Sequence, residues 1–123
     1  MKHQIVIVGG GAAGIAAAAG LLKRRRDLDV AIIEPKDKHY YQPGWTMVGG
    51  GVFDFDFTVR PQSACIPKRA TWIKKAASAF DPENNAVILE DGERVDYDWL
   101  IAAPGVKLNP AAIPGLEETL GKN

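Results

Sequence analysis

A glycine pattern between an apolar run and an alanine-rich stretch most narrowly limits what this chain can fold into. Gly9, Gly11 and Gly14 follow the run Ile5-Val6-Ile7-Val8, and the segment 12–25 has the composition of a helix. The β-branched run does not alternate with polar residues, which is typical of a central parallel strand buried on both faces. The pattern therefore predicts a strand, a tight glycine turn and a helix that packs closely on the strand.

Each glycine of the pattern has a separate function in a turn that binds a dinucleotide. Gly9 would make the tight turn, Gly11 would let the backbone approach a pyrophosphate, and Gly14 would let the helix lie close to the strand. The backbone amides of Ala12 and Ala13 would then point at the anion from the helix N-terminus, where the helix dipole favours negative charge. We therefore expect a nucleotide to bind at this turn.

A second buried-strand pattern follows the helix and ends at an acidic residue. Val30-Ala31-Ile32-Ile33 leads into Glu34, which lies 20 residues beyond Gly14. A carboxylate there can accept hydrogen bonds from the hydroxyls of an adenosine ribose, and it would repel a 2′-phosphate, which disfavours NADP. The coincidence of strand, turn, helix, second strand and acid predicts an α/β chain with a Rossmann-like FAD/NAD(P)-binding fold.

FAD and NAD sites share the glycine pattern, so two further features choose between them. The pattern begins at residue 9, as it does where the ADP half of FAD nucleates the fold. Leu100-Ile101-Ala102 then leads into Ala103, Pro104 and Gly105, which resemble the strand–turn motif, usually ending Ala-Thr-Gly, that flavoproteins of the disulfide-reductase type place near FAD. FAD is therefore the expected cofactor.

The rest of the chain predicts fewer regular elements. A third strand is expected at 71–74, and a hairpin turned on Asp91-Gly92 is expected to join segments 86–89 and 94–97. The segment 35–67 is irregular, with a short helix at 43–48. The remaining expectations are a short strand or extended loop at 53–58, a separate strand at 97–103, and no further element after residue 105.

Composition excludes several classes of function. Lys plus Arg and Asp plus Glu each number 15, so no net charge draws the chain to nucleic acid or to anionic lipid. The basic run 23–26 is interpreted as the last helical turn, where cations complement the helix dipole.

The first apolar run is too short for a signal peptide or a membrane span. No metal site is predicted.

The residues that follow the second strand carry a family resemblance. The segment 39–51 is His39-Tyr40-Tyr41-Gln42-Pro43-Gly44-Trp45-Thr46-Met47-Val48 followed by three glycines. It is similar to a segment of sulfide:quinone oxidoreductases, most of all of the mitochondrial type and its bacterial relatives. The similarity continues at Arg60-Pro61, Ile66-Pro67, Thr71-Trp72-Ile73-Lys74, Phe80-Asp81-Pro82-Glu83-Asn84-Asn85 and Ile113-Pro114-Gly115-Leu116. These enzymes belong to the FAD-dependent pyridine nucleotide-disulfide oxidoreductase superfamily, in which a three-stranded β-meander commonly replaces a crossover helix.

The resemblance implies roles for particular residues. Glu34, with the backbone of Pro35 and Lys36, would hold the adenosine. Gln42 and Pro43 would lie beside the flavin ring or its ribityl chain. The backbone of Ala77 would face the adenine edge, and residues 103–105 would close over the cofactor.

The resemblance also implies what the whole enzyme does. It would oxidise sulfide and reduce a membrane quinone, as a cytoplasmic or peripheral membrane protein. The cysteine pair that these enzymes use lies in later parts of their chain, and Cys65 matches neither member. Cys65 is therefore interpreted as structural or incidental, and no catalytic residue is expected here. Residues 1–123 would be the N-terminal part of an incomplete FAD-binding domain, inactive alone, with an exposed sheet edge that allows a homodimer.

Two alternative functions stay open at this point. A fragment of a type II NADH:quinone oxidoreductase would share the layout, and NADH oxidation by the parent would identify it. A non-catalytic nucleotide-sensing domain, complete at this length, would be colourless and would bind NAD or ADP.

Overall fold

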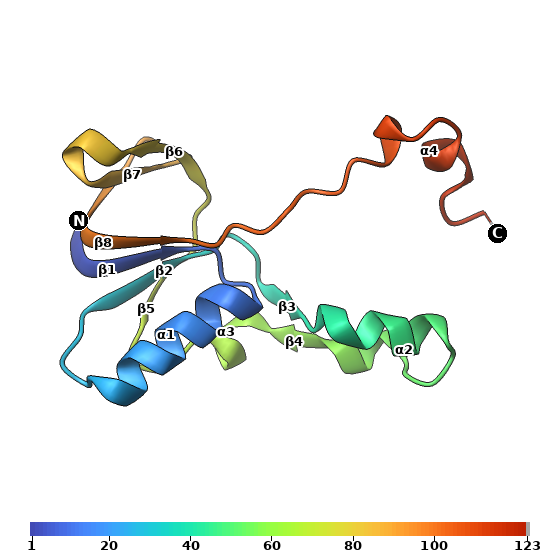
Figure 1. Ribbon diagram of the computed structural model, residues 1–123, viewed down its shortest axis with the longest axis horizontal. Helices are drawn as coiled ribbons and strands as arrows, with labels where there is room; N and C mark the ends of the chain where they lie inside the picture. The colour runs from blue at the N-terminus through green and yellow to red at the C-terminus, as the bar shows by residue number, and fades with distance from the viewer. Residues whose placement is uncertain (123) are drawn as a thin grey trace.

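The computed structural model describes residues 1–122, in which a six-stranded sheet is the central element (Figure 1). The strand order is β5-β2-β1-β8-β7-β6. β1 pairs in parallel with β2 and β8, β2 pairs in parallel with β5, and β6, β7 and β8 pair antiparallel. The strand bounds are Lys2–Val8 (β1), Val30–Ile33 (β2), Thr71–Ile73 (β5), Ala77–Asp81 (β6), Ala86–Leu89 (β7) and Arg94–Ala102 (β8). The predicted Rossmann-like α/β fold with a β-meander is confirmed.

The central strand β1 is buried on both faces, as its apolar run predicts. Ile5 and Ile7 pack against helix α1 (Ala12–Arg24), together with alternate residues of β2. Val6 and Val8 face the opposite way, into a cluster formed with the meander strands β7 and β8. The meander therefore covers the face of the sheet that α1 leaves open, and both faces are closed within this chain.

Two expectations about the strands need correction. β8 is one continuous strand, whereas the sequence suggested one strand at 94–97 and another at 97–103. Its first residues, 94–96, pair with β7, and residues from Asp96 to Ala102 pair with β1. A long twisted strand can in this way belong to the meander at its start and to the parallel sheet over the rest of its length. β6 was not predicted, because the sequence Ala77-Ser78-Ala79-Phe80-Asp81 contains no β-branched residue.

The irregular segment forms an arm that projects from the sheet (Figure 1). Its base is a two-stranded antiparallel ribbon of β3 (Lys38–Tyr40) and β4 (Val59–Pro61). The expected short helix is confirmed, as a 3₁₀ turn at Gln42–Gly44 followed by α2 (Trp45–Gly49). The expectation of a strand or extended loop at 53–58 is wrong: Phe55–Thr58 is a 3₁₀ helix, and the rings of Phe53 and Phe57 lie against each other with centroids 4.6 Å apart and planes tilted by 45°. A short helix α3 (Gln62–Cys65) follows β4.

The chain continues beyond β8 in two short helical elements, although none was expected there. Residues Pro110–Ala112 form a 3₁₀ turn, and α4 spans Leu116–Thr119. The hydroxyl of Thr119 donates a hydrogen bond of 2.7 Å to the carbonyl of Gly115. Within residues 1–122, no helix combines the length and the hydropathy needed to cross a membrane.

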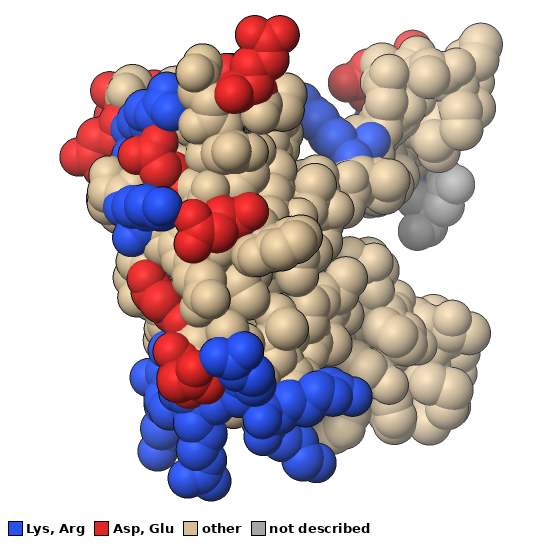
Figure 2. Space-filling view, turned by 60° about the vertical axis from the view of Figure 1, so that its left-hand side comes forward, with Lys and Arg blue, Asp and Glu red and all other residues tan. Residues whose placement is uncertain are grey.

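Basic side chains gather near the C-terminal end of α1, at the lower edge of the view in Figure 2. Arg69 reaches across from another segment and donates to the carbonyls of Leu22 and Arg26. Arg24 donates to the carbonyl of Gly20 at 3.2 Å. Arg69 therefore satisfies one free carbonyl of the last helical turn, that of Leu22, and the basic side chains lie where the helix dipole favours cations, which agrees with the structural interpretation of the basic run.

The N-terminal end of α1 depends on close backbone contact. A Cβ added at Gly14 would lie 1.9 Å from the carbonyl oxygen of Gly9. Gly9 itself has a φ of +108°, and a Cβ there would lie 2.1 Å from the carbonyl oxygen of Ala103. Helix, turn and β8 therefore meet where side chains cannot fit.

This contact generates the first testable prediction. Gly14→Ala forces the helix away from the turn, and we expect it to lower the free energy of unfolding by about 3 kcal/mol or more, in the range of an overpacked core site. Gly20→Ala is the matched control in the same helix, because its nearest obstacle is the flexible end of Arg24 at 3.3 Å. The control should be neutral or stabilising by up to about 1 kcal/mol. Urea unfolding measures both, and equal stabilities of the two variants would contradict the prediction.

Candidate functional site

A hollow of about 510 Å³ lies at the carboxyl ends of β1, β2 and β8. This is where β1 connects through α1 to β2 on one side and pairs with β8 on the other, the kind of place where open α/β sheets bind ligands. Most of the predicted site residues line it: Gly11, Ala12, Ala13, Glu34, Lys36, Gln42, Pro43, Ala103, Pro104 and Gly105. Residues up to 94 positions apart in the sequence, from Gly11 to Gly105, are therefore brought together at one hollow.

The other predicted residues lie outside the lining. Gly9 and Gly14 form the buried turn beneath the hollow, where the amide of Gly9 donates to the carbonyl of Ile33 at 2.9 Å. Pro35 is adjacent to the lining but not part of it. Ala77 lies on β6, paired with Leu89, and packs against the apolar cluster of the meander. Cys65 is half-buried at the end of α3, and it too is outside the lining.

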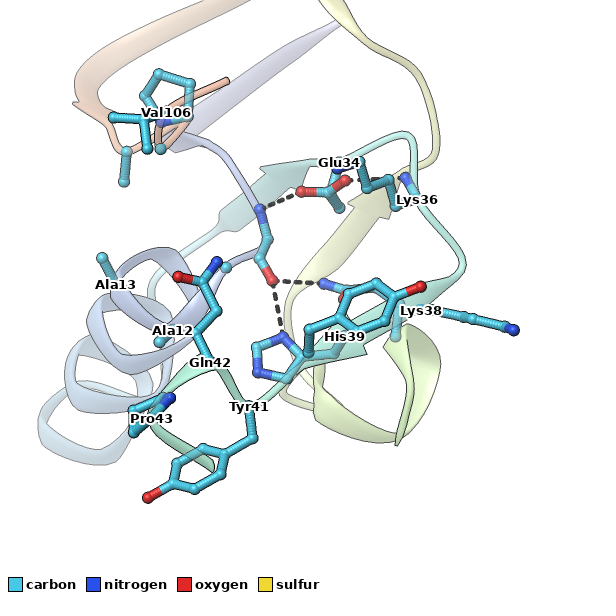
Figure 3. Close-up of a pocket in the computed structure, with 17 residues that line it drawn as sticks. Ala12, Ala13, Glu34, Lys36, Lys38, His39, Tyr41, Gln42, Pro43 and Val106 are labelled. Carbon is cyan, nitrogen blue, oxygen red and sulfur yellow. Dashed lines mark hydrogen bonds between the residues drawn. The ribbon is translucent and has the colours of Figure 1, made fainter. Parts of the chain in front are cut away.

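Glu34 holds the glycine turn in place as well as facing the hollow (Figure 3). One carboxylate oxygen accepts a hydrogen bond of 2.8 Å from the amide of Gly10, and the other accepts one of 2.9 Å from the amide of Lys36. Each oxygen has a further lone pair, so the carboxylate can still accept from the hydroxyls of a ligand.

Residues of the arm close the hollow on a second side. His39, Tyr40 and Tyr41 line it, and Gln62 reaches it from the start of α3. The side-chain amide of Gln62 donates to the carbonyl of Gly10 at 2.7 Å, and Nδ1 of His39 lies 3.3 Å from the same oxygen (Figure 3).

Several lining residues were missed by the sequence prediction. A signal was available for Gly10, as the middle of three consecutive glycines, and for His39 to Tyr41, which belong to the segment that carries the family resemblance. Gln62 carried none, because its contact with Gly10 joins positions 52 residues apart. The other lining residues outside the predicted set are Lys38, His39, Tyr40, Tyr41 and Val106.

The turn and the helix start suit a phosphate-bearing ligand. A Cβ at Gly11 would meet no atom of the protein within 4 Å, although Gly11 lines the hollow, so the backbone there is open to close approach. The amides at the start of the 13-residue helix α1 point outward without a side-chain cap, and no acidic residue lies in its first turn. Free amides and a helix dipole together favour an anion such as a pyrophosphate.

The fold and the hollow together define a dinucleotide-binding domain of the Rossmann type. Residues 3–123 match the pyridine nucleotide-disulphide oxidoreductase family, and the chain belongs to that family. Its similarity to sulfide:quinone oxidoreductases is confirmed by two curated relatives, both named as mitochondrial enzymes of that kind. The relative from Dictyostelium discoideum is 46% identical over 95 residues, covering 77% of this chain and 21% of the relative. The relative from Mus musculus is 35% identical over 116 residues, covering 94% of this chain and 26% of the relative.

A solved structure agrees with these relatives. The sulfide:quinone oxidoreductase of the hyperthermophilic bacterium Aquifex aeolicus superimposes with a TM-score of 0.75 at 27% sequence identity, over 87% of this chain and 25% of that structure. The chain thus spans about a quarter or less of the length of the first relatives it matches. The family consists of flavoprotein oxidoreductases.

A second prediction separates folding from binding at Gly11. Gly11→Ala adds a methyl group that meets no protein atom, so we expect the free energy of unfolding to change by no more than ~1 kcal/mol, the scale of an N-cap substitution. The same methyl group would occupy the approach of a pyrophosphate, so the affinity for FAD should fall at least about tenfold. Gly49→Ala is the control, since its Cβ is also free of contacts and Gly49 lies outside the hollow. Titration followed by flavin fluorescence measures the affinities, and unchanged binding by Gly11→Ala would contradict the prediction.

Proposed function

We propose that this chain is the FAD-binding segment of an oxidoreductase that oxidises sulfide and reduces a quinone. The observation that carries the proposal is the 46% identity to a sulfide:quinone oxidoreductase, together with a hollow at the position where the glycine turn meets the start of α1. FAD would supply the ability to accept an electron pair from one substrate and deliver it to another. The chain's own residues would bind the cofactor, orient it and shield it from water.

In the proposed binding mode, the pyrophosphate and the adenosine of FAD contact different residues of the hollow. The amides of Ala12 and Ala13, at the start of α1, would receive the pyrophosphate beside Gly11. Glu34 would accept hydrogen bonds from the adenosine ribose, and Lys36 would flank it. The fixed position of the Glu34 carboxylate, which is held by two backbone amides, supports that role.

The flavin half is proposed to lie toward the arm and the turn after β8. Gln42 and Pro43 start the 3₁₀ turn at the edge of the hollow, where they would contact the ring or the ribityl chain. Residues 103–105 would close over the cofactor from the opposite side. The backbone of Ala77 and the peptide of Pro35 keep their proposed roles near the adenosine, although neither residue lines the hollow.

The activity of the whole protein is part of the same proposal. Its substrates would be sulfide and a membrane quinone, and it would be a cytoplasmic or peripheral membrane protein whose sulfur-handling cysteines lie elsewhere in the polypeptide. Residues 1–123 would form the N-terminal part of its FAD-binding domain. The outer edge of β8 beyond Tyr97 supports this: β7 pairs only with residues 94–96, the amide of Tyr97 donates to the carbonyl of Asn85, and the described strands leave the rest of that edge unpaired. A further segment, or a second copy in a homodimer, would pair there.

A third prediction tests the cofactor directly. The purified chain, incubated with FAD and then freed of excess, should retain the visible absorption bands of a flavin, with an affinity lowered by the absent walls of the site. A protein that stays colourless and also ignores FAD would contradict the proposal.

The substrates require the parent protein. Sulfide-dependent reduction of a short-chain ubiquinone by the full-length enzyme supports the proposed activity. NADH oxidation without a sulfide requirement would assign the parent to the type II NADH:quinone class, and a colourless domain that binds NAD or ADP would point to a sensor. Sustained turnover by the 123-residue chain alone would contradict its role as a segment.

A further inference from the structure

We infer that Gln62 is a positioning residue of the dinucleotide site, which fixes the Gly10 peptide so that the amides after it face the pyrophosphate. The inference rests on the proposed binding of a dinucleotide and adds to it a residue of the arm. Gln62 belongs to neither the glycine turn nor the two strands that flank it, yet it contacts the turn directly.

Gly10 is held through both of the peptide groups that flank its Cα. Its amide donates to Glu34 at 2.8 Å, and its carbonyl accepts from the side chain of Gln62 at 2.7 Å. A Cβ at Gly10 would lie 2.3 Å from the amide nitrogen of Gln62 and 2.6 Å from Cγ of Glu34. The two side chains therefore enclose Gly10 so tightly that a side chain at this position would displace one of them.

Burial makes the Gln62 contact strong enough to orient a peptide. The side chain is 1% exposed, one of the two buried polar residues among those described. A buried hydrogen bond is costly to leave unmade, because its groups have no water to replace the partner. The orientation of the Gly10 carbonyl in turn sets the direction of the next amide, that of Gly11, since the two belong to one planar peptide group.

The same contact fastens the arm to the turn. The backbone amide of Gln62 donates to the carbonyl of Asp37 at 2.7 Å, at the base of the β3–β4 ribbon. His39, on β3, adds a longer contact of 3.3 Å to the Gly10 carbonyl. His39 on β3 and Gln62 directly after β4 thus contact the same carbonyl oxygen, that of Gly10. The position of the arm is therefore coupled to the geometry of the glycine turn.

The fourth prediction tests Gln62 by substitution. Gln62→Met keeps the length of the side chain and removes the donor, and Gln62→Glu keeps the shape but places a carboxylate against the carbonyl. Both should lower the affinity for FAD and for ADP at least about tenfold, the scale of one buried hydrogen bond. Binding of adenosine, which lacks the phosphates, should change by less than about threefold.

Thr58→Val is the matched control for damage to the arm. Thr58 is the other buried polar residue, and its hydroxyl donates to the carbonyl of Phe55 at 2.7 Å, within the arm itself. This variant should lose a comparable amount of stability in thermal unfolding while its affinity for ADP stays within about twofold of the wild type.

Amide hydrogen exchange tests the inference independently of any ligand. In both Gln62 variants the protection of the Gly10 amide should fall at least about tenfold, whereas that of the core amides of Ile7 and Ile32 stays unchanged. Wild-type protection at Gly10 in the variants, a parallel loss at all amides, or failure of both variants to fold would overturn the inference. A wild-type chain that binds neither FAD nor ADP would refute the proposed function, and the exchange at Gly10 would still decide the role of Gln62 in holding the turn.

Discussion

The contact between the first turn of α1 and the end of β1 is the constraint on which the rest of the structure depends. Gly14 lies against the carbonyl of Gly9, and Gly9 lies against Ala103 at the end of β8. These contacts place the start of the helix at the carboxyl ends of three parallel strands. The free amides at the start of α1 therefore lie at the hollow, which Ala12 and Ala13 line.

The electrostatics of the hollow follow from that placement. The first turn of α1 carries no acidic side chain, so its dipole and amides are available to an anion. The acid that does line the hollow, Glu34, is directed by two backbone amides toward the side of the turn. Lys36 and Lys38 contribute to the lining of the same region. A ligand with phosphates at one point and hydroxyls a short distance away matches this sequence of donors and acceptors.

Local patterns predicted the centre of the fold, and contacts distant in sequence determined the rest. The β-branched runs predicted β1 and β2, and Asp91-Gly92 predicted the hairpin, in which Gly92 has a φ of +84°. The ribbon of β3 and β4 was missed because each strand has only three residues and no alternation of apolar and polar side chains. Its pairing is decided by the tertiary contacts at its base, which a propensity argument does not include.

The candidate site shows the same division. The glycines and Glu34 were predictable because a βαβ unit fixes their spacing along the chain. Gln62 was not, because a glutamine between proline and serine has no local feature that indicates burial. Ala77 was placed at the adenine by family resemblance, and its position within β6 depends on pairing with β7.

Exposed apolar side chains extend this reasoning to what surrounds the hollow. They are concentrated on the arm, where Val52 is 64% exposed, and on the segment after β8, where Val106 is 92% exposed. Each of these segments also contributes to the lining, through Tyr41 and Val106. Contiguous exposed apolar surface marks a site of interaction. A segment or partner that packed against Tyr41 and Val106 would therefore bury apolar surface and contact the lining of the hollow at the same time.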